Sequence, residues 1–127
     1  MTVVVDASAI VDALLGVDSV VRRLSLSELH APVTIDAEVV HGLRRKWLGG
    51  LLGDDHGSLA IELFQTIPIT RHPVQPFVNR LWAVRRNITA YDAGYIALAE
   101  LLDVPLLTRD RRLSRSSGHA ARVEYID

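Results

Sequence analysis

Short apolar runs alternate with longer amphipathic segments along the whole chain. Strands are predicted where brief runs of aliphatic residues occur, at residues 3–5, 33–35, 67–69, 104–108 and 122–126. Helices are predicted where apolar residues recur at helical spacing, at residues 7–15, 18–29, 36–48, 58–65, 76–86, 89–102 and 111–116. This alternation predicts an α/β fold, in which helices cover both faces of a central, mainly parallel sheet.

Two segments carry more information than the others. Residues 89–102 are apolar on most sides, which predicts a buried helix. Pro68 lies within the weak run at residues 67–69, and a proline in a strand favours an edge of the sheet. The chain shows no repeat or linker, so its 127 residues are interpreted as one domain, residues 1–127.

Composition excludes several classes of protein. The chain has no cysteine, so neither disulfides nor thiolate metal sites are possible. No basic segment precedes the first apolar run, and no run approaches the roughly 20 residues that a membrane-spanning helix needs. We therefore expect a soluble cytoplasmic protein with no membrane contact.

The cationic residues are almost all arginines, and they are clustered. The formal net charge is only -1, which argues against binding of nucleic acid through bulk charge. A guanidinium group is nevertheless well shaped to bind phosphate. The ordinary explanation, solvated helix faces, is favoured for the clusters at residues 44–46 and 85–86. The cluster at residues 109–115 differs, because it surrounds the carboxylate of Asp110.

Four acidic residues lie where a predicted strand gives way to a helix or where a helix begins. These residues are Asp6, Glu38, Asp92 and Asp110. In a parallel sheet, strand carboxyl ends and helix amino ends meet at one edge, so all four carboxylates are expected there. Clustered carboxylates repel one another, and a hard divalent ion such as Mg²⁺ or Mn²⁺ relieves that repulsion. The pattern predicts metal-dependent phosphoryl chemistry.

Each acid also has an ordinary structural explanation, because acids collect at the amino ends of helices. Asp6 and Asp110 would cap the helices that follow them, and Asp92 lies three residues after the potential cap Thr89. The edge of the sheet alone does not decide between caps and a metal site. The metal site is favoured because the acids come from distant segments and because polar neighbours accompany them, namely Ser8 and Thr108.

Other catalytic chemistries find no candidate residues. The histidines are scattered without the spacing of metal ligands, at positions 30, 41, 56, 72 and 119. No Gly-x-Ser-x-Gly motif occurs, and without cysteine there is no nucleophile for covalent acyl chemistry.

Four stretches together resemble the PIN-domain ribonucleases, and more narrowly the VapC toxins of bacterial toxin–antitoxin pairs. They are Val-Val-Asp-Ala-Ser-Ala at 4–9, Asp-Ala-Glu-Val at 36–39, Thr-Ala-Tyr-Asp-Ala-Gly-Tyr-Ile-Ala-Leu-Ala at 89–99 and Leu-Thr-Arg-Asp at 107–110. The resemblance spans the whole chain in the right order. It implies a three-layer α/β/α PIN-like domain in which Asp6, Glu38, Asp92 and Asp110 bind Mg²⁺ or Mn²⁺. It leaves open whether Asp110 ligates the metal directly or through water, and it implies that Ser8 and Thr108 lie near the metal.

The resemblance also implies an activity and partners. The expected reaction is endonucleolytic hydrolysis of RNA by a metal-activated water. Backbone phosphates would be bound by Arg109, Arg111, Arg112 and Arg86. The expected partners are a second copy of the chain, forming a homodimer, and an antitoxin that covers the acidic site. Apolar residues of the first two helices would suit either a partner or the core, with neither favoured: Ile10, Val11, Leu14, Val20, Val21 and Leu24.

Three alternatives remain open at this stage. A catalytically degenerate PIN-fold module that only binds a partner would keep the fold without the reaction. A phosphoacceptor receiver-like domain is less favoured, since Asp6 is followed by Ala7 instead of a second acid, and the single lysine is Lys46. A DNA-directed nuclease of the same fold would need a longer basic clamp.

Overall fold

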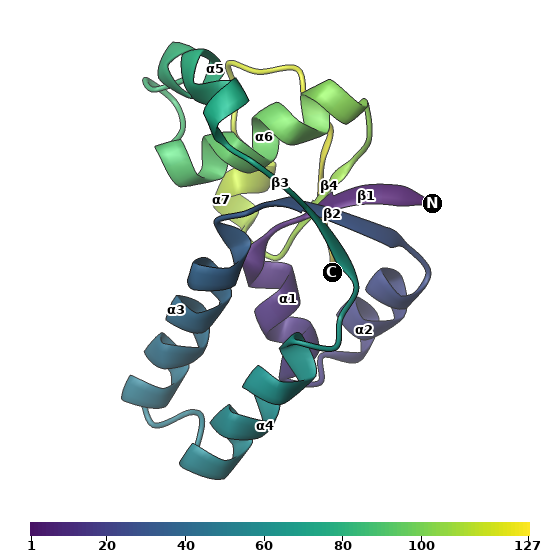
Figure 1. The fold of residues 1–127 in the computed structure, drawn as a ribbon, viewed down its shortest axis with the longest axis vertical. Helices are drawn as coiled ribbons and strands as arrows, with labels where there is room; N and C mark the ends of the chain where they lie inside the picture. The colour runs from purple at the N-terminus through teal and green to yellow at the C-terminus, as the bar shows by residue number, and fades with distance from the viewer.

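The computed structural model describes residues 1–127 and contains one sheet of five parallel strands. The spatial order of the strands is β3-β2-β1-β4-β5 (Figure 1). Their bounds are Thr2–Val5 for β1, Glu28–Pro32 for β2, Ile69–His72 for β3, Leu106–Thr108 for β4 and Val123–Tyr125 for β5. The predicted α/β fold with a parallel sheet is therefore confirmed, and β3, which follows Pro68, lies at an edge.

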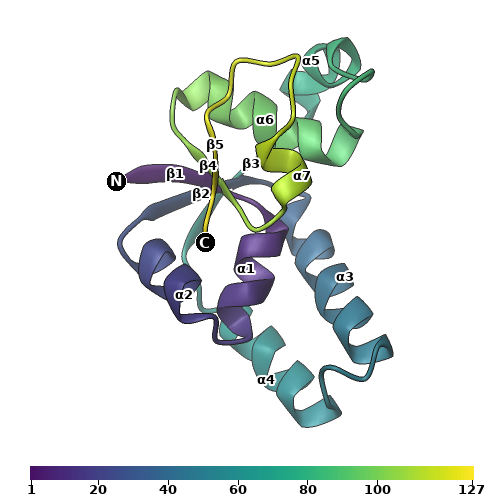
Figure 2. The ribbon, with the colours of Figure 1, turned by 180° about the vertical axis from the view of Figure 1, so that it is seen from behind.

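Helices form a layer on each face of the sheet, as Figures 1 and 2 show. One layer consists of α1 (Ala7–Leu14), α2 (Asp18–Ser25), α3 (Ile35–Leu48) and α4 (Asp54–Phe64). The opposite layer contains α5 (Val78–Ala83), preceded by the 3₁₀ turn η1 (Gln75–Phe77), and α6 (Ala90–Leu102). The short helix α7 (Arg111–Ser114) contacts β4 and β5. These layers form the three-layer α/β/α architecture.

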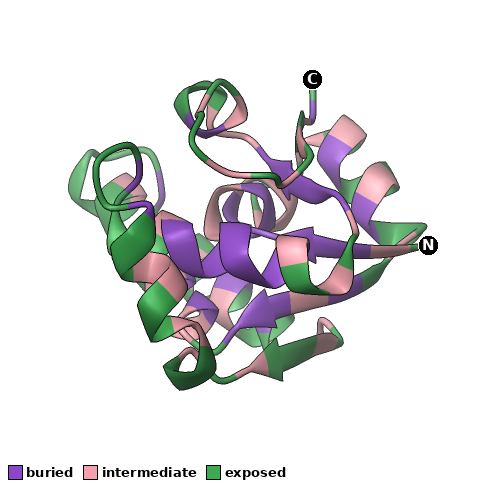
Figure 3. Ribbon diagram, turned by 90° about the horizontal axis from the view of Figure 1, so that it is seen from above, coloured by how far each residue is buried: buried purple, intermediate pink, exposed green.

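The core lies between the sheet and the helices that cover it. Val3, Val4 and Val5 of the central strand are fully buried, as expected for a parallel strand covered on both faces. In α6 every residue from 93 to 99 is buried, which confirms the prediction from its apolar sequence. Figure 3 shows buried residues concentrated in the central strands and in the helices packed on them. None of the helices has both the length and the apolarity needed to cross a bilayer.

The strand order determines where a site can form. From β1 the chain reaches β2 through α1 and α2, whereas β4, the other neighbour of β1, is preceded by α6 of the opposite layer. The carboxyl ends of β1 and β4 therefore flank a crevice, which is where open α/β sheets bind ligands. Val5 pairs with Leu107, so Asp6 and Thr108 leave their strands side by side.

The second strand lies earlier in the chain than predicted. The helix predicted at residues 18–29 ends at Ser25, and residues 28–32 form β2 instead. Residues 33–35, predicted as the strand, form a turn and the first residue of α3. β2 contains no valine, isoleucine or aromatic residue, so its sequence gives no local strand signal. Its conformation is stabilised by pairing with β1 and β3 on either side.

Other boundaries differ by about a turn of helix. α4 begins at Asp54, four residues before the helix predicted at residues 58–65, and the helix predicted at residues 76–86 is divided between η1 and α5. The apolar residues of α1 and α2 belong mainly to the core, since Ile10, Val11, Val20 and Leu24 are buried. The other two apolar residues predicted for a partner or the core, Leu14 and Val21, line a groove of about 470 Å³ between α1, α2 and α4, together with Leu63.

Candidate active site

Asp6 connects β1 to α1 and is nearly completely buried, with 6% of its surface exposed. One carboxylate oxygen accepts hydrogen bonds from the Ala9 amide at 3.0 Å and the Ser8 hydroxyl at 2.7 Å. The Thr108 hydroxyl donates a short hydrogen bond to the other oxygen. Burial raises the pKa of Asp6 to about 6, even though these hydrogen bonds oppose the rise. The charge of Asp92 adds to the rise.

Glu38 lies in the first turn of α3, facing α6. The Tyr95 hydroxyl donates a hydrogen bond of 2.6 Å to Oε2, while Oε1 is buried and has no hydrogen-bond partner. The Thr34 hydroxyl is close to the carboxylate without reaching hydrogen-bond geometry with Oε1. Burial raises the pKa of Glu38, and the neighbouring charges of Asp92 and Asp6 raise it further. A buried carboxylate oxygen without a partner is unfavourable unless a ligand satisfies it.

Asp92 lies in the first turn of α6, whose N-cap is Thr89. The Thr89 hydroxyl accepts the Asp92 amide at 3.3 Å, so the cap predicted from the sequence is present. The side chain of Asp92 is 22% exposed, and Arg112 Nη2 contacts its carboxylate at 3.2 Å. Because its charge acts on both Asp6 and Glu38, three of the four predicted acids form one electrostatic cluster.

Asp110 lies at the margin of this cluster. It caps α7, accepting hydrogen bonds from the amides of Arg112 at 2.9 Å and Leu113 at 3.3 Å. The same Arg112 Nη2 that contacts Asp92 also contacts Asp110 at 3.2 Å. The charge of Asp110 does not figure among the causes that shift the pKa values of Asp6 and Glu38. The structure therefore places Asp110 beside Asp92, with an arginine between them.

Ser8 and Thr108 connect the ends of the two central strands. Their hydroxyl oxygens lie 3.3 Å apart, and both donate to the carboxylate of Asp6. Ser8 Oγ also accepts the Arg109 amide at 2.9 Å, and Thr108 Oγ1 accepts the Asp110 amide at 2.9 Å. This network fixes the orientation of Asp6 relative to the turn that carries Asp110.

The ordinary explanation by helix caps is correct for two acids but does not account for the whole arrangement. Asp6 and Asp110 do cap α1 and α7. Glu38 caps nothing, since the N-cap of α3 is Thr34. Caps gain from solvated carboxylates near exposed amides, whereas Asp6 and Glu38 are held where burial and the charge of Asp92 raise their pKa values. An additional role is needed to explain their placement.

The chemistry of these residues fits a hard divalent cation. The donors are carboxylate oxygens, the ligands that Mg²⁺ and Mn²⁺ prefer, and Glu38 Oε1 is a buried oxygen without a partner. In the present conformation no three histidine or acidic side chains converge on a common point. Ser8, Thr108, Tyr95 and Arg112 each hold a carboxylate oxygen instead. A bound ion would therefore need side-chain rotations and the displacement of Arg112.

The arginines predicted to bind RNA lie in different surroundings. Arg109 is held by Asp12 at 2.8 Å and by the Ile126 carbonyl at 2.7 Å, and Arg111 stacks on the Tyr125 ring at 4.2 Å. Arg112 bridges the two acids described above. Of the four predicted residues, only Arg86 has no acidic partner. It lines a hollow of about 370 Å³ together with Asp92.

Tyr95 is the residue of the site that the sequence interpretation missed. The signal was available, because Tyr95 follows Asp92 by three residues on the same helix and so occupies the same face. It was assigned to the core, and its 1% exposure agrees with that assignment. Its hydroxyl nevertheless reaches Glu38, and the burial and the Glu38 charge both raise the tyrosine pKa, so it remains a hydrogen-bond donor.

Comparisons with known proteins agree with this geometry. The PIN domain model matches residues 3–118. Ribonuclease VapC12 of Mycobacterium tuberculosis (strain ATCC 25618 / H37Rv) is 39% identical over 127 residues, covering 98% of each chain. The crystal structure of PAE2754 from Pyrobaculum aerophilum has a TM-score of 0.70 at 22% identity, covering 99% of this chain and 92% of that one. A toxin-antitoxin complex from Klebsiella pneumoniae contains a chain with a TM-score of 0.62 at 16% identity, covering 96% and 95%. The two structural likenesses show the fold.

Proposed function

Because this chain belongs to the PIN domain family, and within it to the VapC ribonucleases, we propose that it hydrolyses RNA with a bound divalent metal ion, as the toxin of a toxin–antitoxin pair. The observation that supports the metal dependence is the pair of carboxylates formed by the buried Asp6 and the half-buried Glu38. The charge of Asp92 raises the pKa of both, that of Asp6 adds to the rise at Glu38, and neither Asp6 nor Glu38 is neutralised by an arginine. The unpartnered Glu38 Oε1 is the vacant acceptor that a cation would fill.

The residues have distinct tasks in this proposal. Asp6, Glu38 and Asp92 would hold Mg²⁺ or Mn²⁺, and Asp110 would act through water once Arg112 has moved away. Such an ion, when bound, lowers the pKa of a water molecule and neutralises charge that develops on the phosphate. Ser8 and Thr108 fix the carboxylate of Asp6, and Tyr95 fixes one oxygen of Glu38. Arg112, once displaced, is placed to contact a backbone phosphate.

The expected chemistry is attack of water on the scissile phosphorus, in line with the departing oxygen. Water, and not the ribose 2′-hydroxyl, is the nucleophile, so the products carry a 5′-phosphate and a 3′-hydroxyl. The phosphate end group therefore distinguishes this reaction from a metal-independent cleavage through a cyclic phosphate.

A cleavage assay on total RNA tests the proposal. The wild type is compared with Asp6→Asn and Asp92→Asn in Mg²⁺, in Mn²⁺ and in chelator. Asp36→Asn is the matched control, because Asp36 lies on α3 two residues before Glu38 but is exposed and paired with Arg71 at 2.7 Å. We expect metal-dependent cleavage by wild type and control, and loss of at least 100-fold in the other two variants. Cleavage that survives chelator, or that both site variants retain, would contradict the proposal.

We propose an antitoxin partner on separate grounds. The bridge from Arg112 to Asp92 and Asp110 shows that a guanidinium group fits the acidic cluster, so an arginine of a partner would find the same contact. The apolar groove between α1, α2 and α4 offers a surface for the rest of such a partner. The test is co-purification with the product of a neighbouring open reading frame, followed by the same cleavage assay. Full cleavage by the free chain and loss of cleavage in the complex are expected, and equal rates would contradict the idea.

The homodimer remains part of this proposal. Sedimentation of the purified chain at several concentrations measures its assembly directly. A mass near twice 14.0 kDa is expected.

A further inference from the structure

A second basic region lies beside the acidic cluster, in a groove that the sequence did not single out. This groove has a volume of about 540 Å³ and runs between α1 and α3. Glu38 and Ser8 line it near the acids, and His41, Arg45 and Lys46 line it further along α3. None of these three side chains makes an ion pair with an acid of the chain. Two cations without partners, Arg45 and Lys46, therefore lie in the same groove as Glu38.

The spacing along α3 brings these residues to one face. Positions 38, 41 and 45 follow the three- and four-residue intervals that align side chains on a helix. At a rise of 1.5 Å per residue, Arg45 lies about 10 Å along the helix from Glu38. The long side chain of Arg45 is therefore placed to contact a phosphate near a scissile phosphate bound at the acids.

Gly42 has no side chain to fill this groove. It also lines the groove, between the acid and the cations, and a β-carbon there would lie only 2.9 Å from Val11 Cγ2 of α1. The two helices therefore pack closely, and no side chain of position 42 fills the space above them.

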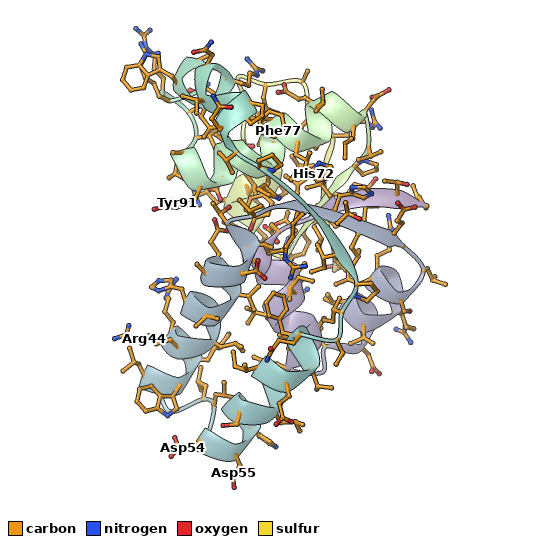
Figure 4. The ribbon with its side chains drawn as sticks, in the orientation of Figure 1. Arg44, Asp54, Asp55, His72, Phe77 and Tyr91 are labelled. Atoms are coloured by element: carbon orange, nitrogen blue, oxygen red, sulfur yellow. The ribbon has the colours of Figure 1, made fainter.

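The usual explanation for cations at this place is the helix dipole. Arg45 and Lys46 lie in the last turn of α3, where positive charge is favourable. The helix dipole explains why these two residues are cations. It does not explain why their side chains lie on the face of α3 that lines the groove, because a cation on any face of the last turn would interact with the dipole. Arg44 immediately precedes that turn, yet it lines the groove between α3 and α4 instead. Figure 4 shows Arg44 projecting from α3 on the side away from α1.

A matching hollow lies on the opposite side of the acids. It is lined by Asp92 together with Arg86, Arg112 and Arg115. Arg86 and Arg115 have no acidic partner, unlike most other arginines of the chain. The acids therefore lie between two basic hollows, Glu38 bordering one and Asp92 the other. Positively charged grooves of this kind follow the backbone of single-stranded nucleic acid.

We propose that the α1–α3 groove is a phosphate-binding subsite for single-stranded RNA, in which His41, Arg45 and Lys46 hold the backbone on one side of the scissile bond. The strand then crosses the acids and leaves through the hollow that contains Arg86 and Arg115. This inference rests on the proposed ribonuclease function. It adds the path of the substrate and the residues that set its register.

The test measures RNA binding separately from cleavage. A labelled single-stranded oligoribonucleotide is titrated in chelator, which prevents metal-dependent cleavage, and fluorescence anisotropy gives Kd at several salt concentrations. The variants are Arg45→Ala and the double variant Arg45→Ala/Lys46→Ala, with Arg44→Ala as the control of equal charge from the preceding position. Thermal melting confirms that each variant is folded, since all three positions lie at the surface of α3.

We expect the double variant to bind about ten-fold or more weakly than wild type and to lower the slope of log K against log salt. Loss of two phosphate contacts lowers that slope by about 1.4 for a single strand. Arg44→Ala should retain wild-type affinity and slope, and duplex RNA should compete poorly. Wild-type affinity and slope in the double variant, or an equal loss in Arg44→Ala, would overturn the subsite.

The outcome is distinguishable from failure of the ribonuclease proposal. If the wild type cleaves RNA with metal while the double variant binds and cleaves normally, the subsite is wrong and the nuclease stands. If the double variant loses binding while no metal-dependent cleavage is found in any variant, the subsite stands and the nuclease is wrong.

Discussion

Asp6 and Glu38 are held in surroundings that disfavour their negative charge. Burial is the largest cause of the raised pKa in both cases, and the hydrogen bonds from Thr108, Ser8 and Tyr95 offset only part of it. A protein selected for stability alone would replace such carboxylates with neutral groups of similar shape. The metal-free protein is therefore expected to be less stable than its site variants near neutral pH.

Asp6→Asn should reveal how much the buried charge of Asp6 destabilises the fold, through the pH dependence of the unfolding free energy. The folded-state pKa of Asp6 is about 6, above the model value of 3.8, so its contribution to stability is complete below pH 3.8 and is lost as pH rises through 6. Asparagine cannot ionise, so the variant does not lose this stability as the pH rises. Relative to wild type, the variant should therefore gain up to about 3 kcal/mol between pH 4 and pH 8.

Urea unfolding in chelator at several pH values measures this difference. Asp36→Asn serves as the control, because Asp36 is exposed and paired with Arg71. A difference between Asp6→Asn and wild type that stays constant from pH 4 to pH 8 would mean that Asp6 ionises normally in the fold.

Tyr95→Phe should act through Glu38 without removing any acid. The variant loses the 2.6 Å hydrogen bond to Oε2, which leaves both oxygens of the carboxylate unsatisfied and raises the pKa of Glu38 further. Loss of a hydrogen bond to a charged group costs about 1.5–3 kcal/mol, so stability at pH 8 should fall by roughly that amount. The acidic limb of the pH profile for RNA cleavage should move to higher pH.

Cleavage rates between pH 5 and pH 9, together with urea unfolding, test this positioning role. Tyr91→Phe is the matched control, since Tyr91 lies one turn earlier on α6 and is 67% exposed. Figure 4 shows Tyr91 at the start of that helix, pointing outward. A pH profile of Tyr95→Phe that coincides with the wild-type profile would restrict Tyr95 to core packing.

Among the elements, those with strong local signals could be predicted from the sequence. β1 is a run of β-branched residues, and α6 is long and apolar, so hydrophobic periodicity located both. β2 could not be found, because its sequence Glu-Leu-His-Ala-Pro becomes a strand only through pairing with its two neighbours. The error moved the strand by about five residues but left Glu38 in the first turn of α3, so the candidate site survived it.

The same contrast holds for the elements of the site. The acids could be predicted because each follows a strand or begins a helix, which topology brings to one edge of the sheet. The ion-pair partners of the arginines could not be predicted from the sequence, because the contact of Arg112 with Asp92 depends on the packing of α7 against the sheet. The α1–α3 groove depends likewise on how closely two helices approach, which residue spacing within each helix does not reveal.

Gly42→Ala should force α1 and α3 apart. The added methyl group would lie 2.9 Å from Val11 Cγ2, and Val11 is buried, so the neighbouring side chain cannot move aside freely. Overpacking costs about 1–3 kcal/mol, which exceeds the roughly 1 kcal/mol that alanine gains over glycine within a helix. A net loss of up to about 2 kcal/mol in unfolding free energy is expected.

Gly57→Ala provides the comparison on α4. There the nearest side-chain atom, Leu52 Cδ2, is at an ordinary contact distance of 3.7 Å, so the gain in helix propensity should stabilise the protein by about 0.5–1 kcal/mol. Chemical denaturation of both variants gives the two signs directly. A stabilised Gly42→Ala protein would show that the helices separate easily and that the groove is not fixed by their packing.

At the scale of the whole molecule, a net charge of -1 conceals a strongly uneven distribution. The sheet order brings acids to the crevice between β1 and β4, while α3 and the region around α7 place unpartnered cations on either side. This arrangement repels the phosphate backbone from the acids and attracts it at the flanks. A cation bound at the centre removes that repulsion, so metal and substrate should bind cooperatively.

Divalent metal should therefore stabilise the entire fold. A ligand that binds only the folded state adds about 2.7 kcal/mol at 100 times its Kd, which for a domain of this size raises Tm by several degrees. The Mn²⁺ concentration needed reflects the competing bridge from Arg112, because the ion must displace a guanidinium group from Asp92. Differential scanning fluorimetry across a Mn²⁺ titration should show the shift in wild type and in Asp36→Asn and show none in Asp92→Asn. An equal shift in all three proteins would place the ion elsewhere on the surface, and the repulsion between Asp6 and Glu38 would then need another explanation.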